Sequence, residues 1–171
     1  IQENRVTHMF ASPALLRRIA NFTRGQTLKL TSIKRVLTAG APVSLDVIGD
    51  IQKLLIDAQV HTPYGATEAL PISSISSDEL FKLEAETERI GVCVGRPLPG
   101  IKVRIVPISE EPIENLGDVS NCDLGEIGEL VVAGPNVSQK YDQNPNANML
   151  SKVHLNDNQW AHRLGDLGHL D

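Results

Sequence analysis

Residues 33–68 read IKRVLTAGAPVSLDVIGDIQKLLIDAQVHTPYGATE. The run Ile33–Thr38 is typical of a β-strand, and Leu45–Ala58 has the spacing of an amphipathic helix, with apolar residues at positions 45, 47, 48, 51, 54 and 55. Val60 begins a second short strand. The pattern predicts a βαβ unit over residues 33–64, whose parallel strands bring two turns to one sheet edge. Open α/β sheets bind their ligands at this edge.

The second of these turns is His61-Thr62-Pro63-Tyr64-Gly65-Ala66-Thr67-Glu68. Tyr64 offers a flat ring on which a purine can stack, and Gly65 lets the backbone pass close by. Thr67 offers a hydroxyl to a phosphate oxygen, and Glu68 is the kind of oxygen ligand that Mg²⁺ prefers. An alternative interpretation makes it a strand-to-helix turn, with Thr67 as N-cap and Glu68 opposing the helix dipole.

The sequence pattern changes about halfway along the chain, from alternating strands and helices to short β segments. A strand is expected around Val6–Phe10, and Ser12-Pro13 predicts the start of a helix over residues 13–24. Beyond the charged stretch 78–89, short β segments alternate with Gly and Pro. These segments are Val92–Val94, Val103–Val106 and Leu130–Val132; Pro97–Gly100 is expected to form a turn, and Ser109–Leu124 an exposed hairpin loop.

Composition excludes several classes of function. The 171 residues are 41% hydrophobic with a net charge of −5, which suits a globular domain and disfavours nucleic acid as a partner. The longest apolar runs are too short to span a bilayer, so we expect a cytoplasmic protein without a transmembrane segment. Cys93 and Cys122 are far apart in the sequence, so neither a disulfide framework nor a zinc site is expected. The five histidines lack the spacing of metal ligands and are assigned no metal.

Four motifs occur in a fixed order that covers nearly the whole chain. They are Ala39-Gly40-Ala41-Pro42, Tyr64-Gly65-Ala66-Thr67-Glu68, Gly128-Glu129-Leu130-Val131-Val132-Ala133-Gly134-Pro135 and His162-Arg163-Leu164-Gly165-Asp166-Leu167-Gly168. Together they resemble the adenylate-forming superfamily, which includes acyl-CoA synthetases, fatty-acyl-AMP ligases, peptide-synthetase adenylation domains and luciferases. The resemblance implies the cofactors ATP/AMP and Mg²⁺.

The resemblance assigns a role to each motif. The turn Gly40, Ala41 and Pro42 would line the adenine and acyl pockets, and Tyr64, with Gly65 beside it, would stack on adenine. Thr67 would contact the α-phosphate, and Glu68 would bind Mg²⁺. Asp166 would accept hydrogen bonds from both ribose hydroxyls, which two carboxylate oxygens allow. The implied reaction is attack of a carboxylate on the α-phosphate of ATP, giving an acyl adenylate and pyrophosphate.

Three positions depart from the family pattern. Thr62 replaces an adenine-contacting Asn or Asp, so adenine recognition is expected to use backbone groups. Leu164 replaces a threonine beside the ribose carboxylate. Lys140-Tyr141 replaces a Gly-Tyr pair at the end of the third motif, which argues against close backbone contact there.

The implied fold is α/β, part of a large N-terminal domain. A parallel βαβ sheet portion over residues 1–89, with the adenine and phosphate motifs, precedes a small distorted β-barrel over residues 90–171 that ends at the ribose motif. The family's upstream phosphate loop and its C-terminal domain with a catalytic lysine are not found in the sequence. The isolated chain is therefore expected to be inactive.

The stretches His61–Pro71 and Gly91–Pro97 resemble the branch with the β-lactone synthetases of bacterial olefin biosynthesis. This implies a fatty or β-hydroxy fatty acid as substrate, with the acyl group passing either to CoA or a carrier protein or to the substrate's own hydroxyl. Both acceptors stay open. A third hypothesis is a catalytically silent nucleotide-binding or interaction module derived from such a ligase.

Overall fold

The computed structural model describes residues 1–84, 91–156 and 159–171, and it divides the chain into two compact units. The first unit comprises residues 1–64 and 73–96, and the second comprises residues 65–72 and 97–171. The boundary that the sequence suggests, at residue 89, lies outside the described residues. None of the described helices is long and apolar enough to cross a lipid bilayer.

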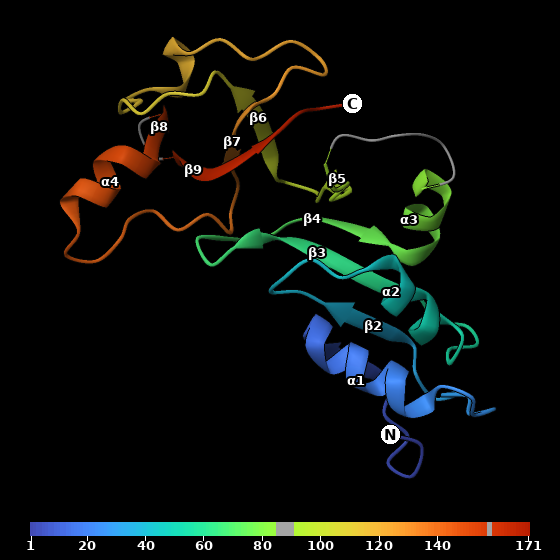
Figure 1. Ribbon diagram of the computed structural model, residues 1–171. Helices are drawn as coiled ribbons and strands as arrows, with labels where there is room; N and C mark the ends of the chain where they lie inside the picture. Colours follow the sequence, from blue (N-terminus) through green and yellow to red (C-terminus); the bar gives the residue numbers. More distant parts are fainter. Residues whose placement is uncertain (85–90, 157–158) are drawn as a thin grey trace. The chain divides into compact units, whose positions relative to one another are not determined.

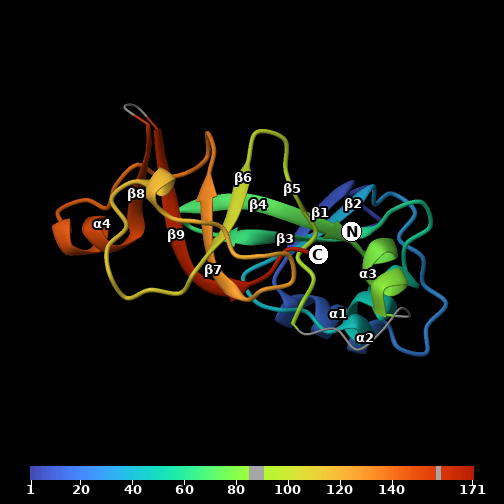
Figure 2. The same cartoon turned by 90° about the horizontal axis from the view of Figure 1, so that it is seen from above.

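Strands β1 to β5 form a sheet in the order β1-β2-β3-β4-β5. Their bounds are His8–Ala11, Arg35–Thr38, Val60–Ala66, Ala69–Ser76 and Arg96–Pro97. Strands β1, β2 and β3 are parallel neighbours, joined by helices α1 (Pro13–Thr23) and α2 (Leu45–Gln52). Both helices lie on the same face of the strands (Figures 1 and 2). The βαβ unit predicted from residues 33–64 is thus confirmed.

The core of the first unit fills the space between this sheet and its helices. Leu16 of α1, Ile48 and Ile51 of α2, and Val36 and Val60 of the sheet are each at most 1% exposed. Helix α1 begins as its sequence predicts, with Ser12 Oγ accepting a hydrogen bond from the Leu15 amide at 3.3 Å and proline in the first turn.

Helix α2 ends six residues earlier than the predicted Ala58. The chain continues in tight turns, in which the amides of Leu54 and Leu55 donate to the carbonyls of Ile51 and Gln52. Leu54 and Leu55 are still buried. The apolar periodicity therefore marked the buried face correctly but not the end of the helix. Helix α3 (Ser77–Glu84) follows β4 directly.

The second unit contains a four-stranded antiparallel sheet in the order β6-β7-β9-β8. The strands are β6 (Lys102–Val106), β7 (Gly128–Ala133), β8 (Lys152–Asn156) and β9 (Gln159–Gly168), with helix α4 (Pro145–Ser151) before β8 and the short helix η1 (Leu116–Asp118) between β6 and β7. Its core is formed by seven buried side chains: Val106, Ile113, Leu116, Val131, Ala133, Val153 and Ala161. The expected strands at 103–106 and 130–132 and the turn at 97–100 are present.

Two expectations for the region after residue 90 are wrong. Val92–Val94 is not a strand, because Gly91 and Gly95 on either side adopt φ angles of +92° and +83°, which break the extended conformation. The segment 109–124 is not an exposed loop throughout, because Ile113 and Leu116 are buried in the core.

Gly65 occupies a position where no side chain fits. A Cβ atom there would lie 2.4 Å from the Ala69 carbonyl oxygen and 3.0 Å from a methyl group of Leu70, and the residue has φ +156°. The obstructing oxygen belongs to the backbone of the strand that folds back, so it cannot move aside alone. The close approach that the sequence predicts at Gly65 is therefore used to bring the two hairpin strands together.

We expect Gly65→Ala to destabilise the protein by about 1–3 kcal/mol, the usual cost of overpacking a filled site. Equilibrium urea unfolding measures the change. Gly117→Ala is the matched control, because nothing lies within 4 Å of the Cβ position at Gly117. Equal stability of the two variants would contradict the assignment.

Candidate functional site

The motif Tyr64–Glu68 forms the end of one strand and a tight turn. Residues 64–66 complete β3, Thr67 and Glu68 form a two-residue turn, and β4 begins at Ala69. The alternative interpretation of a helix start, with Thr67 as N-cap, is wrong. Pro71 gives the physical reason, because a proline disfavours helical backbone in the residue before it and has no amide to donate.

Glu68 lies at the tip of this hairpin, partly exposed. Its Oε1 accepts a hydrogen bond from the Tyr141 hydroxyl at 2.9 Å. The pKa of Glu68 lies below its usual value, first because its own backbone N–H donates to the carboxylate, then because of the Tyr141 hydroxyl. The charges of His162 and Lys152 add to this effect. The hairpin tip therefore carries a carboxylate that is ionised at neutral pH.

The segment 136–141 runs along the hairpin tip and holds it by its backbone as well. The side-chain amide of Asn136 donates to the Pro71 carbonyl at 2.8 Å, and the Ser138 amide donates to the Glu68 carbonyl at 2.7 Å. Between them, Val137 forms an antiparallel bridge with Ala69. We call residues 136–141 the clasp segment.

Two basic side chains surround the Tyr141 ring. Lys152 Nζ lies 5.0 Å from the ring centroid, and the imidazole of His162 meets the ring edge-on with centroids 6.1 Å apart. Lys152 and His162 face each other across β8 and β9. Burial lowers the pKa of both groups and raises the pKa of Tyr141, whose hydroxyl therefore remains a donor at neutral pH.

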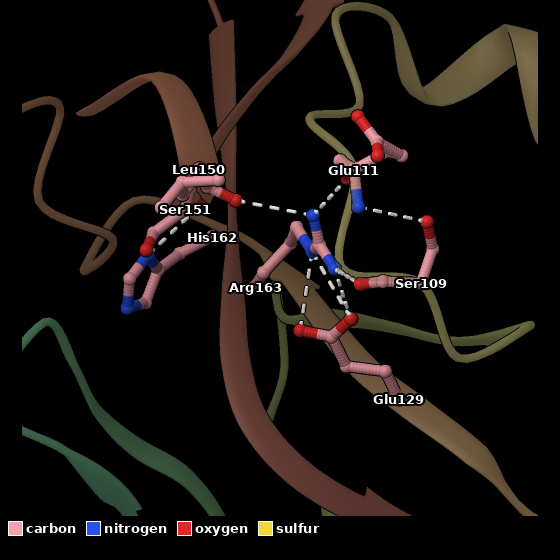
Figure 3. Close-up of polar contacts among 7 residues, drawn as sticks. All are labelled: Ser109, Glu111, Glu129, Leu150, Ser151, His162 and Arg163. Atoms are coloured by element: carbon pink, nitrogen blue, oxygen red, sulfur yellow. Dashed lines mark hydrogen bonds and ion pairs between the residues drawn. The ribbon is translucent and has the colours of Figure 1, made fainter. Parts of the chain in front are cut away.

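Arg163 follows His162 on β9 and forms a buried ion pair (Figure 3). Its Nε lies 3.1 and 3.0 Å from the two carboxylate oxygens of Glu129, and its Nη2 lies 2.6 Å from Oε2. The guanidinium also donates to the backbone carbonyls of Ser109, Glu111 and Leu150. Arg163 and Glu129 are 8% and 7% exposed, so water does not supply these bonds.

The end of α4 is held by the same strand. The carbonyl of Leu150 accepts from Arg163, and the carbonyl of Ser151 lies 3.1 Å from Nδ1 of His162 (Figure 3). The last carbonyls of a helix have no partner within the helix, and positively charged groups near them are favourable. Neighbouring residues of β9 thus supply the caps that α4 needs.

These side chains border a hollow of about 430 Å³ within the second unit. Its lining is mixed polar and apolar and comes from the hairpin tip, the clasp segment, α4, β7, β9 and the loop after β6: Ala66, Glu68, Ser109, Glu110, Glu129, Tyr141, Leu150, Ser151, His162, Arg163, Leu164 and Gly165. Asp166 follows Gly165 on β9 and is exposed, and Gly165 turns the backbone with φ +74°.

The remaining predicted residues lie in the first unit. Gly40, Ala41 and Pro42 form an exposed turn directly after β2, and Gly40 has φ +93°. Leu37 pairs with His61, so the chain leaves β2 at the edge toward which β3 continues to Tyr64. At the end of β2, Thr38 is 2% exposed.

Sequence reasoning missed part of this arrangement. The four motifs include Tyr141 only through its neighbour Lys140, which replaces the family's glycine, and they do not include Ser138, Asn148 or Lys152. Their local sequence shows no catalytic pattern. A signal was available for Asn148 alone, because Asn144-Pro145 predicts a helix start four residues before it; Lys152 begins strand β8 and has no such signal.

The chain was compared with known proteins. The family model described as AMP-binding enzyme matches residues 1–142. The chain is 40% identical over 177 aligned residues to an olefin β-lactone synthetase of Stenotrophomonas maltophilia and 38% identical over 172 to one of Xanthomonas campestris. These alignments cover 100% and 97% of the chain but only 31% and 30% of the two relatives. An acyl-CoA ligase, M9, of a Phoma species is 30% identical over 99% of the chain.

Solved structures with the same fold include VinN, with a TM-score of 0.76 and 26% identity over 99% of the chain and 38% of VinN. O-succinylbenzoate coenzyme A synthetase from Bacillus subtilis, solved in complex with ATP and magnesium ion, has a TM-score of 0.70 and 28% identity. That match covers 99% of the chain and 30% of the synthetase. The chain thus spans about a third of the length of the proteins that it matches.

We expect Arg163→Met to lower the free energy of unfolding by about 3–5 kcal/mol, because it leaves the Glu129 carboxylate buried without its cation. Adding Glu129→Met should recover part of this loss, but not all of it, since three backbone carbonyls lose their donor as well. Urea unfolding of both variants measures the two effects. A double variant no more stable than Arg163→Met would contradict the ion pair's role.

Proposed function

Because the chain belongs to the family of AMP-binding enzymes, we propose that it carries part of the adenylate site of an ATP-dependent acid ligase. The observation that supports this most directly is Glu68, an ionised carboxylate at a hairpin tip, held by the Tyr141 hydroxyl at 2.9 Å and bordering the hollow of the second unit. Among the described residues, the only side chain that donates to its carboxylate is a neutral hydroxyl, so the group keeps its charge and can bind a cation.

The residues present fit a Mg²⁺ ion that is bound together with a nucleotide, rather than one coordinated by protein side chains alone. Among residues 1–84, 91–156 and 159–171, no three His, Cys, Asp or Glu side chains are grouped closely enough to hold a metal. Mg²⁺ typically binds through one or two carboxylates together with substrate phosphates and water, and Glu68 provides such a carboxylate. When bound, the ion neutralises charge on the phosphates.

The other motif residues would hold the nucleotide. In this proposal Tyr64, with Gly65 beside it, stacks on the adenine, and the turn of Gly40, Ala41 and Pro42 leaves room for close approach of the ligand. Thr67, exposed in the hairpin turn beside Glu68, donates its hydroxyl to the α-phosphate. Asp166, exposed on β9, accepts hydrogen bonds from the two ribose hydroxyls.

The proposed first step needs no covalent protein intermediate. A carboxylate oxygen of the acid attacks the α-phosphorus of ATP, and the bond to the β,γ-phosphates breaks and releases pyrophosphate. Thr67 stabilises the charge that develops on the α-phosphoryl oxygens, and Glu68 fixes the geometry of that end of the nucleotide. The product is an acyl adenylate with an activated carbonyl carbon.

We further propose that the acid is a fatty acid with a β-hydroxyl group. The support is the similarity to the two olefin β-lactone synthetases, which is higher than that to the acyl-CoA ligase. A β-lactone is the internal ester of a β-hydroxy acid. The substrate's hydroxyl oxygen would attack its own acyl carbon, AMP would leave, and the hydroxyl proton would pass to solvent.

We expect Glu68→Gln and Asp166→Asn each to reduce acid-dependent ATP–pyrophosphate exchange by at least a hundredfold in the whole protein, since an amide replaces an oxygen ligand or acceptor. Glu3→Gln and Asp57→Asn make the same chemical changes at exposed positions and should retain activity. Exchange at the parental rate in either site variant would overturn the assignment of that residue.

Product analysis identifies the second step. The whole protein is incubated with a long-chain β-hydroxy fatty acid, ATP and Mg²⁺, with and without CoA, and the products are identified by mass spectrometry. We expect β-lactone and AMP in equal amounts without CoA. A thioester that forms only when CoA is present would replace this proposal with an acyl-CoA ligase.

A further inference from the structure

We infer that Tyr141 is a positioning residue for Glu68, and that Asn148 on α4 holds Tyr141 in place for this task. The inference rests on the proposed function and extends it to residues outside the four motifs. It concerns only the second unit, which contains the hairpin tip, the clasp segment and α4.

The hydroxyl of Tyr141 reaches a carboxylate 73 residues earlier in the chain, at 2.9 Å from Oε1 of Glu68. The two backbones are joined close by, through the 2.7 Å hydrogen bond from the Ser138 amide to the Glu68 carbonyl. Glu68 is therefore held at both its backbone and its side chain by one short stretch of the clasp segment. A glutamate that only had to turn a hairpin would need neither contact.

Asn148 holds the backbone of Tyr141 from two sides. Its Oδ1 accepts from the Tyr141 amide at 2.6 Å, and its Nδ2 donates to the Tyr141 carbonyl at 3.0 Å. A side-chain amide has one acceptor and one donor group, so this pairing uses both. It fixes the position and orientation of the Tyr141 backbone.

The Tyr141 ring is held as well. His162 contacts its edge, and the Lys152 ammonium lies 5.0 Å from its centroid. Lys152 is 4% exposed, and Nζ donates to the carbonyl and hydroxyl of Ser138 at 2.7 and 2.9 Å. The Lys152 ammonium therefore makes a cation–π contact with the ring and also hydrogen-bonds to the clasp segment. Backbone, ring and hydroxyl of Tyr141 are each constrained by a different partner.

This arrangement orients Glu68 without neutralising it. A carboxylate offers about four acceptor positions on its two oxygens, and the neutral hydroxyl occupies one of them. An arginine or lysine in the place of Tyr141 would orient the group equally well but would compete with a divalent cation. Partners that orient a ligand in this way commonly change metal affinity or activity by 10–100-fold when they are removed.

The test uses Tyr141→Phe in the whole protein, which removes the hydroxyl and keeps the ring that packs against His162 and Lys152. We expect the Mg²⁺ concentration for half-maximal ATP–pyrophosphate exchange to rise about tenfold. The KM for the acid should change less than twofold, and Tm should fall by only a few degrees. A readout independent of activity is Mn²⁺ affinity in the presence of ATP, measured from the electron paramagnetic resonance of free Mn²⁺, and it should weaken by the same factor.

A second pair of variants tests the role of α4. Asn148→Asp keeps the acceptor for the Tyr141 amide but loses the donor to its carbonyl, and it should shift the Mg²⁺ and Mn²⁺ dependence in the same direction as Tyr141→Phe. Asn146→Asp adds the same charge at an exposed position of the same helix and should shift neither. Equal shifts in Asn148→Asp and Asn146→Asp would overturn the role of Asn148.

Three outcomes decide the inference. A higher half-maximal Mg²⁺ concentration and weaker Mn²⁺ binding, with an intact fold, support it. Parental Mg²⁺ and Mn²⁺ dependence in Tyr141→Phe, with an active parent protein, would overturn it while the proposed function stands. A parent protein that binds no Mn²⁺ with ATP and exchanges no pyrophosphate with any fatty acid would overturn the proposed function, and the inference with it.

Discussion

A buried guanidinium group must find its hydrogen bonds inside the protein, because it cannot lose its charge. Arg163 meets this constraint by binding the Glu129 carboxylate and three backbone carbonyls, from the loop after β6 and from the end of α4. One side chain on β9 therefore joins β7, that loop and α4. The arrangement of the second unit depends on this group, since its removal leaves the Glu129 carboxylate buried without a cation and takes a donor from three backbone carbonyls.

The end of α4 links this ion pair to the hairpin tip. Arg163 and His162 hold the last carbonyls of the helix, and from the same helix Asn148 holds Tyr141. The chain of contacts then passes from Tyr141 to Glu68. The geometry of a partly exposed carboxylate is thereby tied to the buried ion pair of Arg163 and Glu129, through bonds that are all shorter than 3.3 Å. Such a connection suits a ligand site, where an error of an ångström in one side chain is costly.

The βαβ unit, α1 and the strands β6 and β7 could be predicted because their patterns are local. Apolar side chains at a spacing of two or of three to four residues identify the buried face wherever the element lies. The same rule failed at Val92–Val94, where apolar residues between two left-handed glycines form no strand. It also misplaced the end of α2, because tight turns continue to bury Leu54 and Leu55 after the helix has ended. The helix start considered at Thr67 overlooked Pro71.

By itself, the sequence determined the family, the order of its four motifs and the identity of Glu68 as the carboxylate at a turn. These are properties of short stretches, and residue type and order suffice to state them. Only the tertiary structure decided that the turn is a hairpin tip and that Tyr141, Lys152 and Asn148 serve it. The reason is physical: a 2.9 Å hydrogen bond between residues 68 and 141 exists only after two distant segments have paired, and no local spacing records that pairing. The ligands that a carboxylate can bind follow from its chemistry, but the orientation in which its side chain is held follows from the fold.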